Sequence, residues 1–275
     1  MPFHLFKHED PNAGLRRVAL EQIDIAVDGF ADNTIPLGRK VHSLRARCKK
    51  LRGMLRLVRP MLGDEVYKDQ DAQYRAAAKE LAGSRDRDVA LKTLGTLGIE
   101  AESGSHADVP ADSVNRSLEI LSACRVAVDA WPLTVAGFDE LAPGFSRTYT
   151  KCLDAWAAVQ LDPTDLNYHQ LRKNAKYHWY HVRVLERINK KKIRERRHKL
   201  RDLQLTLGDA HDLYMLQSFL RGNTDYALSL YEQAIARKHA LYGRGAELAS
   251  SVFAQTADEI EAEYASWWAE SRGEG

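Results

Sequence analysis

Cysteines, long apolar runs and, over one long stretch, acidic residues are scarce in this 275-residue sequence. The three cysteines, Cys48, Cys124 and Cys152, are far apart and odd in number, which argues against a disulfide framework or a CxxC zinc site. No apolar run approaches the ~20 residues that a membrane helix needs, and the first residues lack the apolar centre of a signal peptide. We therefore expect a cytoplasmic protein that does not enter a membrane.

Acidic residues are absent from Thr34 to Gly63, although the whole chain has a formal charge of only +2. Residues 39–59 carry nine Lys or Arg, and residues 166–201 carry thirteen more with only two Glu. These two windows hold 22 of the 40 basic residues and 2 of the 38 acidic ones. Their formal charges therefore sum to +20, and those of the rest of the chain sum to −18. Such a polarised distribution points to a polyanionic partner.

The apolar residues follow a helical period almost throughout the sequence. Helices are expected near residues 11–32, 38–58, 74–81, 85–94, 111–131, 144–159 and 165–190, with two shorter helices and a long C-terminal one after them. No window alternates with period two between hairpin turns, so strands are not expected. The predicted fold class is all-α.

The two halves of the sequence resemble each other weakly, through three anchors that keep their order. Residues 42–45 match 169–172 at an offset of 127, residues 85–86 match 211–212 at 126, and residues 14–17 match 144–147 at 130. We predict a single domain over residues 1–275, made by internal duplication from repeat halves 11–132 and 137–270.

Basic residues form one row along a helix in each half. At about 100° per residue, the first row falls within about 40° of one line and consists of Arg45, Lys49, Arg52, Arg56 and Arg59. The second row consists of Arg172, Lys176, Arg183 and Arg187. A solvated helix face usually mixes Glu with Lys, because like charges four residues apart repel at a few tenths of a kcal/mol per pair. A row without acids in both halves therefore favours a phosphate-binding face, where guanidinium groups grip oxygens in pairs.

The two rows belong to motifs that resemble a known family. The segments His42-x-x-Arg45-x-x-x-Lys49-x-x-Arg52 and His169-x-x-Arg172-Lys173-x-x-Lys176-x-x-x-Tyr180 resemble the paired signatures of the CHAD family, the conserved-histidine α-helical domain. Arg85-Asp86 and the segment from Leu207 to Asp212 fall where that family has its second motif. The resemblance covers nearly the whole chain. It implies two four-helix bundles related by a pseudo-two-fold axis, and a basic surface or central groove that binds inorganic polyphosphate, often at polyphosphate granules.

The predicted site combines the family motifs with the residues that extend the rows or repeat between the halves. The residues predicted to bind polyphosphate are Arg17, His42, Arg45, Lys49, Arg52, Arg56, Arg147, His169, Arg172, Lys173, Lys176, Tyr180 and Arg183, with Arg75 and Arg201 as further candidates at matching positions. We predict passive electrostatic binding, with no catalytic residue, no metal and no cofactor. Other polyanions are alternative partners, and the two motif histidines are either ligands or structural hydrogen-bonding groups.

A nucleic-acid-binding function stays open as an alternative. Tyr177, Trp179 and Tyr180 are interleaved with basic residues, a pattern suited to tracking a phosphate backbone and stacking bases.

A metal-dependent phosphohydrolase is a second alternative. His169 with His211 and Asp212 superficially resembles the ligand pattern of helical enzymes of that kind, and His178 and His181 stand three residues apart. A metal site needs several converging ligands, and the first half has an Arg where the second has His211. We therefore predict that the protein is not an enzyme.

Overall fold

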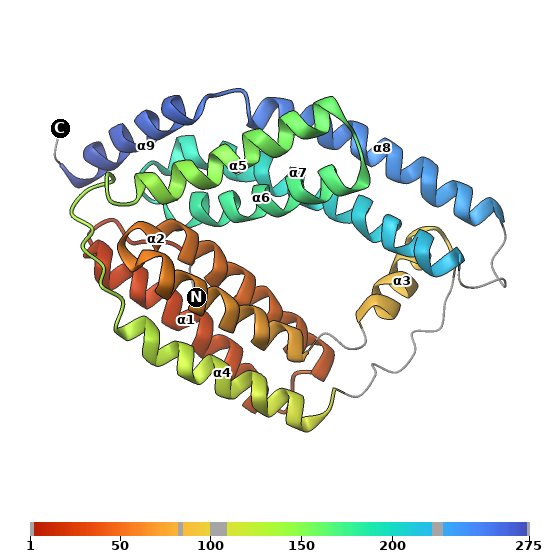
Figure 1. Cartoon of the computed structure of the whole chain (residues 1–275), viewed down its shortest axis with the longest axis horizontal. Coiled ribbons are helices and arrows are strands. Elements are labelled where there is room, and N and C mark those ends of the chain that lie inside the picture. The colour runs from red at the N-terminus through yellow and green to blue at the C-terminus, as the bar shows by residue number, and fades with distance from the viewer. Residues whose placement is uncertain (1–2, 82–84, 100–108, 222–227, 274–275) are drawn as a thin grey trace.

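The computed structural model describes residues 3–81, 85–99, 109–221 and 228–273, without the side chains of residues 85–88 (Figure 1). Over this part of the chain the helices are α1 (Pro11–Ala31), α2 (Leu37–Glu80), α3 (Arg85–Thr96), α4 (Ala111–Asp129), α5 (Ala142–Leu161), α6 (Asp165–Val184), α7 (Lys190–Arg221), α8 (Leu228–Val252) and α9 (Ala257–Arg272). No strand occurs in the described residues, which confirms the all-α prediction. None of the described helices is long and apolar enough to cross a membrane.

Helix starts follow from capping residues in the sequence. Asp10 caps α1 by accepting a hydrogen bond from the backbone of Ala13 at 2.8 Å, and Pro11 occupies the first turn as predicted. Thr256 and Glu259 form a reciprocal capping box at the start of α9. Each cap provides an acceptor for backbone N–H groups that the first turn of a helix leaves unpaired.

Helix α2 is a hairpin of two arms, residues 37–62 and 64–80. The backbone breaks at Gly63, whose φ of 75° lies in the left-handed region that glycine tolerates. The arms lie side by side, because Arg45 on the first arm donates to the carbonyl oxygens of Ala78 and Leu81 at 3.0 and 3.1 Å. The predicted break between the second and third helices is therefore confirmed.

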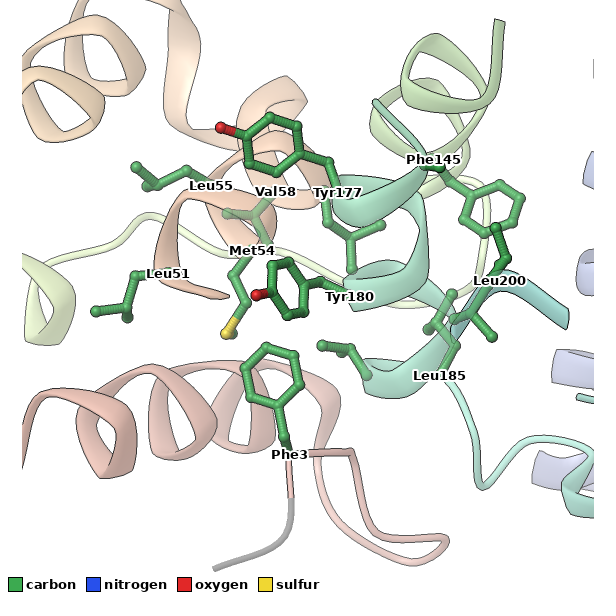
Figure 2. Packing of buried hydrophobic residues seen from close by; sticks show 14 of the residues in the cluster. Phe3, Leu51, Met54, Leu55, Val58, Phe145, Tyr177, Tyr180, Leu185 and Leu200 are labelled. Carbon is green, nitrogen blue, oxygen red and sulfur yellow. The ribbon is translucent and has the colours of Figure 1, made fainter. Parts of the chain in front are cut away.

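The helices gather into two groups that meet where α2 and α6 cross (Figure 1). Helices α1, α2 and α4 pack on one another, while α6 packs on α5 and α7, α8 on α7, and α9 on α5. Gly53 makes room at the crossing, since a Cβ there would lie 2.8 Å from the ring of Tyr180. One large core runs through both groups, and Figure 2 shows Met54 of α2 beside Tyr180 of α6.

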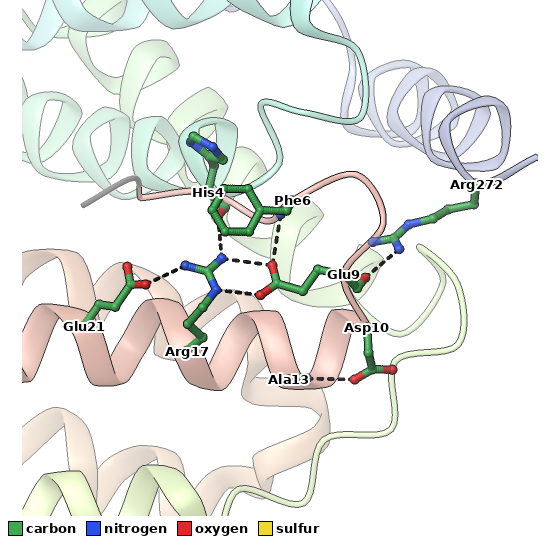
Figure 3. Close-up of polar contacts among 8 residues, drawn as sticks. All are labelled: His4, Phe6, Glu9, Asp10, Ala13, Arg17, Glu21 and Arg272. Carbon is green, nitrogen blue, oxygen red and sulfur yellow. Dashed lines mark hydrogen bonds and ion pairs between the residues drawn. The ribbon is translucent and has the colours of Figure 1, made fainter.

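Two segments connect distant parts of the chain. Helix α3 packs on α7 through a separate small core in which Ala90 and Leu94 face Leu213 and Leu216. The N-terminal segment is held by Leu5, whose N–H donates to the carbonyl of Val184 at 2.9 Å. It is also held by Arg272 of α9, which donates to the carbonyl of Glu9 at 2.7 Å (Figure 3). The duplication of two bundles stays a prediction.

Candidate anion-binding site

Basic side chains of α2 and α6 converge on one cavity of about 320 Å³, which we call the central cavity. It is lined by Arg45, Lys49 and Arg52 of α2, Val89 of α3, His169, Arg172, Lys173, Lys176 and Tyr177 of α6, and His211, Asp212 and Met215 of α7. Six of these twelve residues are Lys or Arg, and one is acidic. The cavity is therefore suited to an anion.

Two smaller cavities continue from the central cavity, one after the other. The second cavity, about 100 Å³, is lined by Arg56, Arg59, Tyr67, Arg147, Thr148, Lys151, Lys173, Asn174 and Tyr177. The third cavity, about 170 Å³, is lined by Arg59, Pro60, Gly63, Asp64, Pro143, Gly144 and Arg147. Lys173 and Tyr177 line both the central and the second cavity, while Arg59 and Arg147 line both the second and the third. The three cavities therefore follow one another along the basic row of α2.

Asp71, on the second arm of α2, holds two guanidinium groups of this row. Its carboxylate is 1% exposed and accepts hydrogen bonds from Arg52 at 2.9 Å and Arg56 at 3.1 Å, and it also pairs with Arg75. Burial raises the pKa of Asp71, but the hydrogen bond from Arg52 and the charges of Arg56 and Arg52 outweigh it and hold the pKa below its usual value. Because three cations share one carboxylate, the cavity edge stays positive.

Two tyrosine rings support the same arginines. The Arg56 guanidinium carbon lies 3.9 Å from the ring centroid of Tyr177, and that of Arg59 lies 4.5 Å from the ring centroid of Tyr67. Such cation–π contacts orient a guanidinium without neutralising its charge. Tyr177, which the sequence suggested as a base-stacking residue, is buried under Arg56 in this arrangement.

Two histidines lie together in the central cavity, and the surroundings of His169 disfavour its protonation. The ring centroids of His169 and His211 are 4.5 Å apart. Burial, followed by the charges of Arg172 and Lys173, lowers the pKa of His169, so its imidazole is neutral at pH 7. Burial also lowers the pKa of Lys173, with further contributions from Arg56 and other nearby cations. Both shifts agree with an excess of positive charge around the cavity.

Most of the predicted site residues come together here. The central cavity contains Arg45, Lys49, Arg52, His169, Arg172, Lys173 and Lys176, and the second cavity contains Arg56 and Arg147. The prediction omitted Arg59, which belongs to the α2 row, and Lys151, which stands one helical turn after Arg147. Helical spacing was the signal that would have found both.

The remaining predicted residues lie outside these cavities. Arg17 is paired with Glu9 at 2.5 Å and Glu21 at 2.8 Å (Figure 3), and Arg75 with Asp71. Tyr180 is buried at the helix crossing, His42 and Arg201 are exposed, and Arg183 packs over Phe3 and Trp179. The side chains of Arg85 and Asp86, from the predicted second motif, are outside the described part. A role in binding stays a prediction for all of these residues.

The histidine pair on α6 is placed away from the cavities. His178 and His181 are fully buried, and His181 Nε2 donates to the carbonyl of Gly53 at 2.9 Å. Burial lowers the pKa of both imidazoles. Across the described ranges no group of three or more His, Cys, Asp or Glu side chains is placed to hold a metal ion. The absence of catalysis itself stays a prediction.

The CHAD domain family model matches residues 26–221, a span that includes every residue of the central, second and third cavities. No curated protein matches the chain, and neither does any solved structure. Because the family match covers well over half of the sequence, the chain belongs to the CHAD domain family, of which polyphosphate binding is a general property.

Proposed function

We propose that the protein binds inorganic polyphosphate along the central, second and third cavities. The observation that carries this proposal is their lining, which contains ten Lys or Arg and two Asp in three neighbouring cavities. The α2 row runs from Arg45 to Arg59, 14 residues further along the helix, which is about 21 Å at 1.5 Å per residue. A row of that length is better matched to a chain of phosphates than to one small anion.

Binding on this surface is electrostatic and needs no catalytic step. The guanidinium groups of Arg52 and Arg56 are already oriented by Asp71 and Tyr177, so little side-chain freedom is lost when phosphate oxygens bind. Neutralised phosphates release their counterions, which makes affinity depend strongly on salt. The acidic remainder of the chain opposes adhesion of polyanions elsewhere on the molecule. Association with polyphosphate granules follows from the same binding.

We also infer that the chain arose by internal duplication. Shifting α1 by 130 residues gives 141–161, and α5 is Ala142–Leu161. Shifting residues 64–96 by 126 gives 190–222, so α7 (Lys190–Arg221) corresponds to the second arm of α2 together with α3. Shifting the first arm, 37–62, by 127 gives 164–189, which contains α6 (Asp165–Val184). These coincidences support the two predicted repeat halves.

The test is a titration with polyphosphates of defined length, using charge reversal on either side of the central cavity. We expect the double variants Arg45→Glu/Lys49→Glu and Arg172→Glu/Lys176→Glu each to abolish measurable binding at 150 mM salt while keeping the helical circular-dichroism spectrum. The variant Lys190→Glu/Lys191→Glu is the matched control, because it changes the net charge equally on exposed residues outside the three cavities. Wild-type affinity in both cavity variants would refute the proposal.

Salt and competition separate polyphosphate from nucleic acid. For nucleic acids, ~6–10 phosphate contacts lose ~10³–10⁵ in affinity between 50 and 200 mM salt, and we expect a similarly steep loss for polyphosphate here. Because Tyr177 and Tyr180 are buried and Arg183 packs over the half-buried Trp179, we expect no salt-resistant base contact and ready displacement of any bound oligonucleotide by polyphosphate. An oligonucleotide that resists such displacement would favour the alternative function.

A further inference from the structure

A second group of cations lies on the side of α2 that faces away from its basic row. Arg47 and Lys50 stand at about 200° and 140° around the helix from Arg45, given 100° per residue. Their charged groups meet at one atom, because Arg47 Nη1 and Lys50 Nζ donate to Gln22 Oε1 of α1 at 2.6 and 3.0 Å. Two cations therefore converge on a single neutral acceptor.

Arg183, from the last turn of α6, adds a third cation to this group. The guanidinium carbon of Arg183 and the ammonium of Lys50 each lie 5.2 Å from the ring centroid of Phe3. The Phe3 ring packs edge-on against Tyr180 at 5.9 Å between centroids (Figure 2). The N-terminal segment therefore places an apolar ring next to two of the cations.

No carboxylate forms an ion pair with this group in the described part of the chain, although the charge of Glu186 acts on Arg183. Neither Arg47, Lys50 nor Arg183 forms an ion pair there, and the nearby Glu186 accepts two bonds from Arg197 at 2.8 Å. Arg17 differs, since it is paired with two carboxylates. Partly buried cations without a counter-charge cost free energy that a bound anion would offset.

Two further properties of the group agree with an anion that binds there. Gln22 is fully buried, and its Nε2 donor has no hydrogen-bond partner within the described residues, so one more donor is at hand beside the cations. Burial, followed by the charges of Arg47 and Arg183, lowers the pKa of Lys50 to about 7. A nearby anion would reverse that shift.

We propose that Arg47, Lys50 and Arg183 form a second anion site, which binds one phosphate-class oxyanion with Gln22 as an additional donor. Two guanidinium forks, one ammonium and one amide match the several oxygens of a phosphate group. The site lies outside the three cavities, and it stands independently of the function proposed for them.

The test follows the Lys50 amine by NMR of the lysine side chains, with its signal assigned by its loss in Lys50→Met. We expect inorganic phosphate or tripolyphosphate to raise the pKa of Lys50 by about one unit or more, as an opposite charge within hydrogen-bonding range does. The variant Arg183→Gln should diminish that rise. An unchanged Lys50 pKa at millimolar concentrations of both ligands would overturn the proposal. A response to tripolyphosphate but not to phosphate supports it and identifies a condensed phosphate as the ligand.

The same measurement in Arg45→Glu/Lys49→Glu separates the two sites. With the central cavity disabled, the response of Lys50 should persist, whether or not polyphosphate binds in that cavity. Loss of the response in this variant would show that the second site is not separate and would overturn the proposal. Failure of polyphosphate binding in the titration above would leave the Lys50 result standing.

Discussion

Replacement of Asp71 by asparagine tests whether the Asp71 carboxylate holds the arginines at the edge of the central cavity in place. The buried carboxylate joins Arg52, Arg56 and Arg75, and Asp71→Asn keeps its shape while removing its charge. Three guanidinium groups would then lose their common counter-charge.

The expected loss of stability follows from the burial of the partners. Breaking a buried ion pair by removing one partner costs about 3–5 kcal/mol, because the other charge stays buried and uncompensated. Arg52 and Arg56 are 17% and 18% exposed, whereas Arg75 is 63% exposed and screened by solvent. We therefore expect the low end of the range, a fall of about 3 kcal/mol in the free energy of unfolding at pH 7.

Denaturant unfolding of the wild type and of Asp71→Asn across pH is the assay. The folded pKa of Asp71 lies below its unfolded value, so its contribution is present above the unfolded pKa and is lost as pH falls through the folded pKa. The two proteins should therefore differ at neutral pH and converge in acid. Bound polyphosphate should restore part of the lost stability, because its phosphates replace the missing counter-charge. Equal stability of the two proteins at pH 7 would refute the role given to Asp71.

Two further substitutions probe the helix crossing and the aromatic support. Gly53→Ala would bring a Cβ to 2.8 Å from the Tyr180 ring, so we expect a loss of about 1–3 kcal/mol in thermal or chemical unfolding, and wild-type stability would contradict the close approach of α2 and α6. Tyr177→Leu removes the ring under Arg56, so we expect polyphosphate affinity to fall about 2–5-fold, the equivalent of ~0.5–1 kcal/mol, while Tyr177→Phe keeps it. Equal affinity in Leu and Phe variants would show that the ring does not orient the guanidinium.

Local features of the molecule were predictable from the sequence because they depend on neighbouring residues. The start of α1 at Pro11 follows from the Asp10 cap, and the break in α2 follows from Gly63. The alignment of Arg45 with Arg56 follows from helical period alone. The fold class, the helix starts and the basic row could therefore be predicted without the tertiary structure.

The pairing of each cation depends on tertiary contacts that no spacing reveals. Arg17 and Arg147 occupy matching positions in the two halves, yet Arg17 is neutralised by Glu9 and Glu21 whereas Arg147 lines two cavities. Tyr180 is buried because Gly53, far away in sequence, lets it pack on α2. The helical period predicts on which helix face each charge lies. Which of these charges face an open cavity depends on how the helices pack.

The hydrogen bonds that hold the N-terminal segment affect how the protein folds. Leu5 bonds to Val184 and Arg272 to Glu9, so one short stretch is tied to the middle and to the end of the described chain. Contacts of such large sequence separation carry a high loop-closure entropy and slow the folding of a helical protein relative to one with local contacts. The N-terminal segment therefore completes its packing only once residues from the middle and from the end of the described chain are in place.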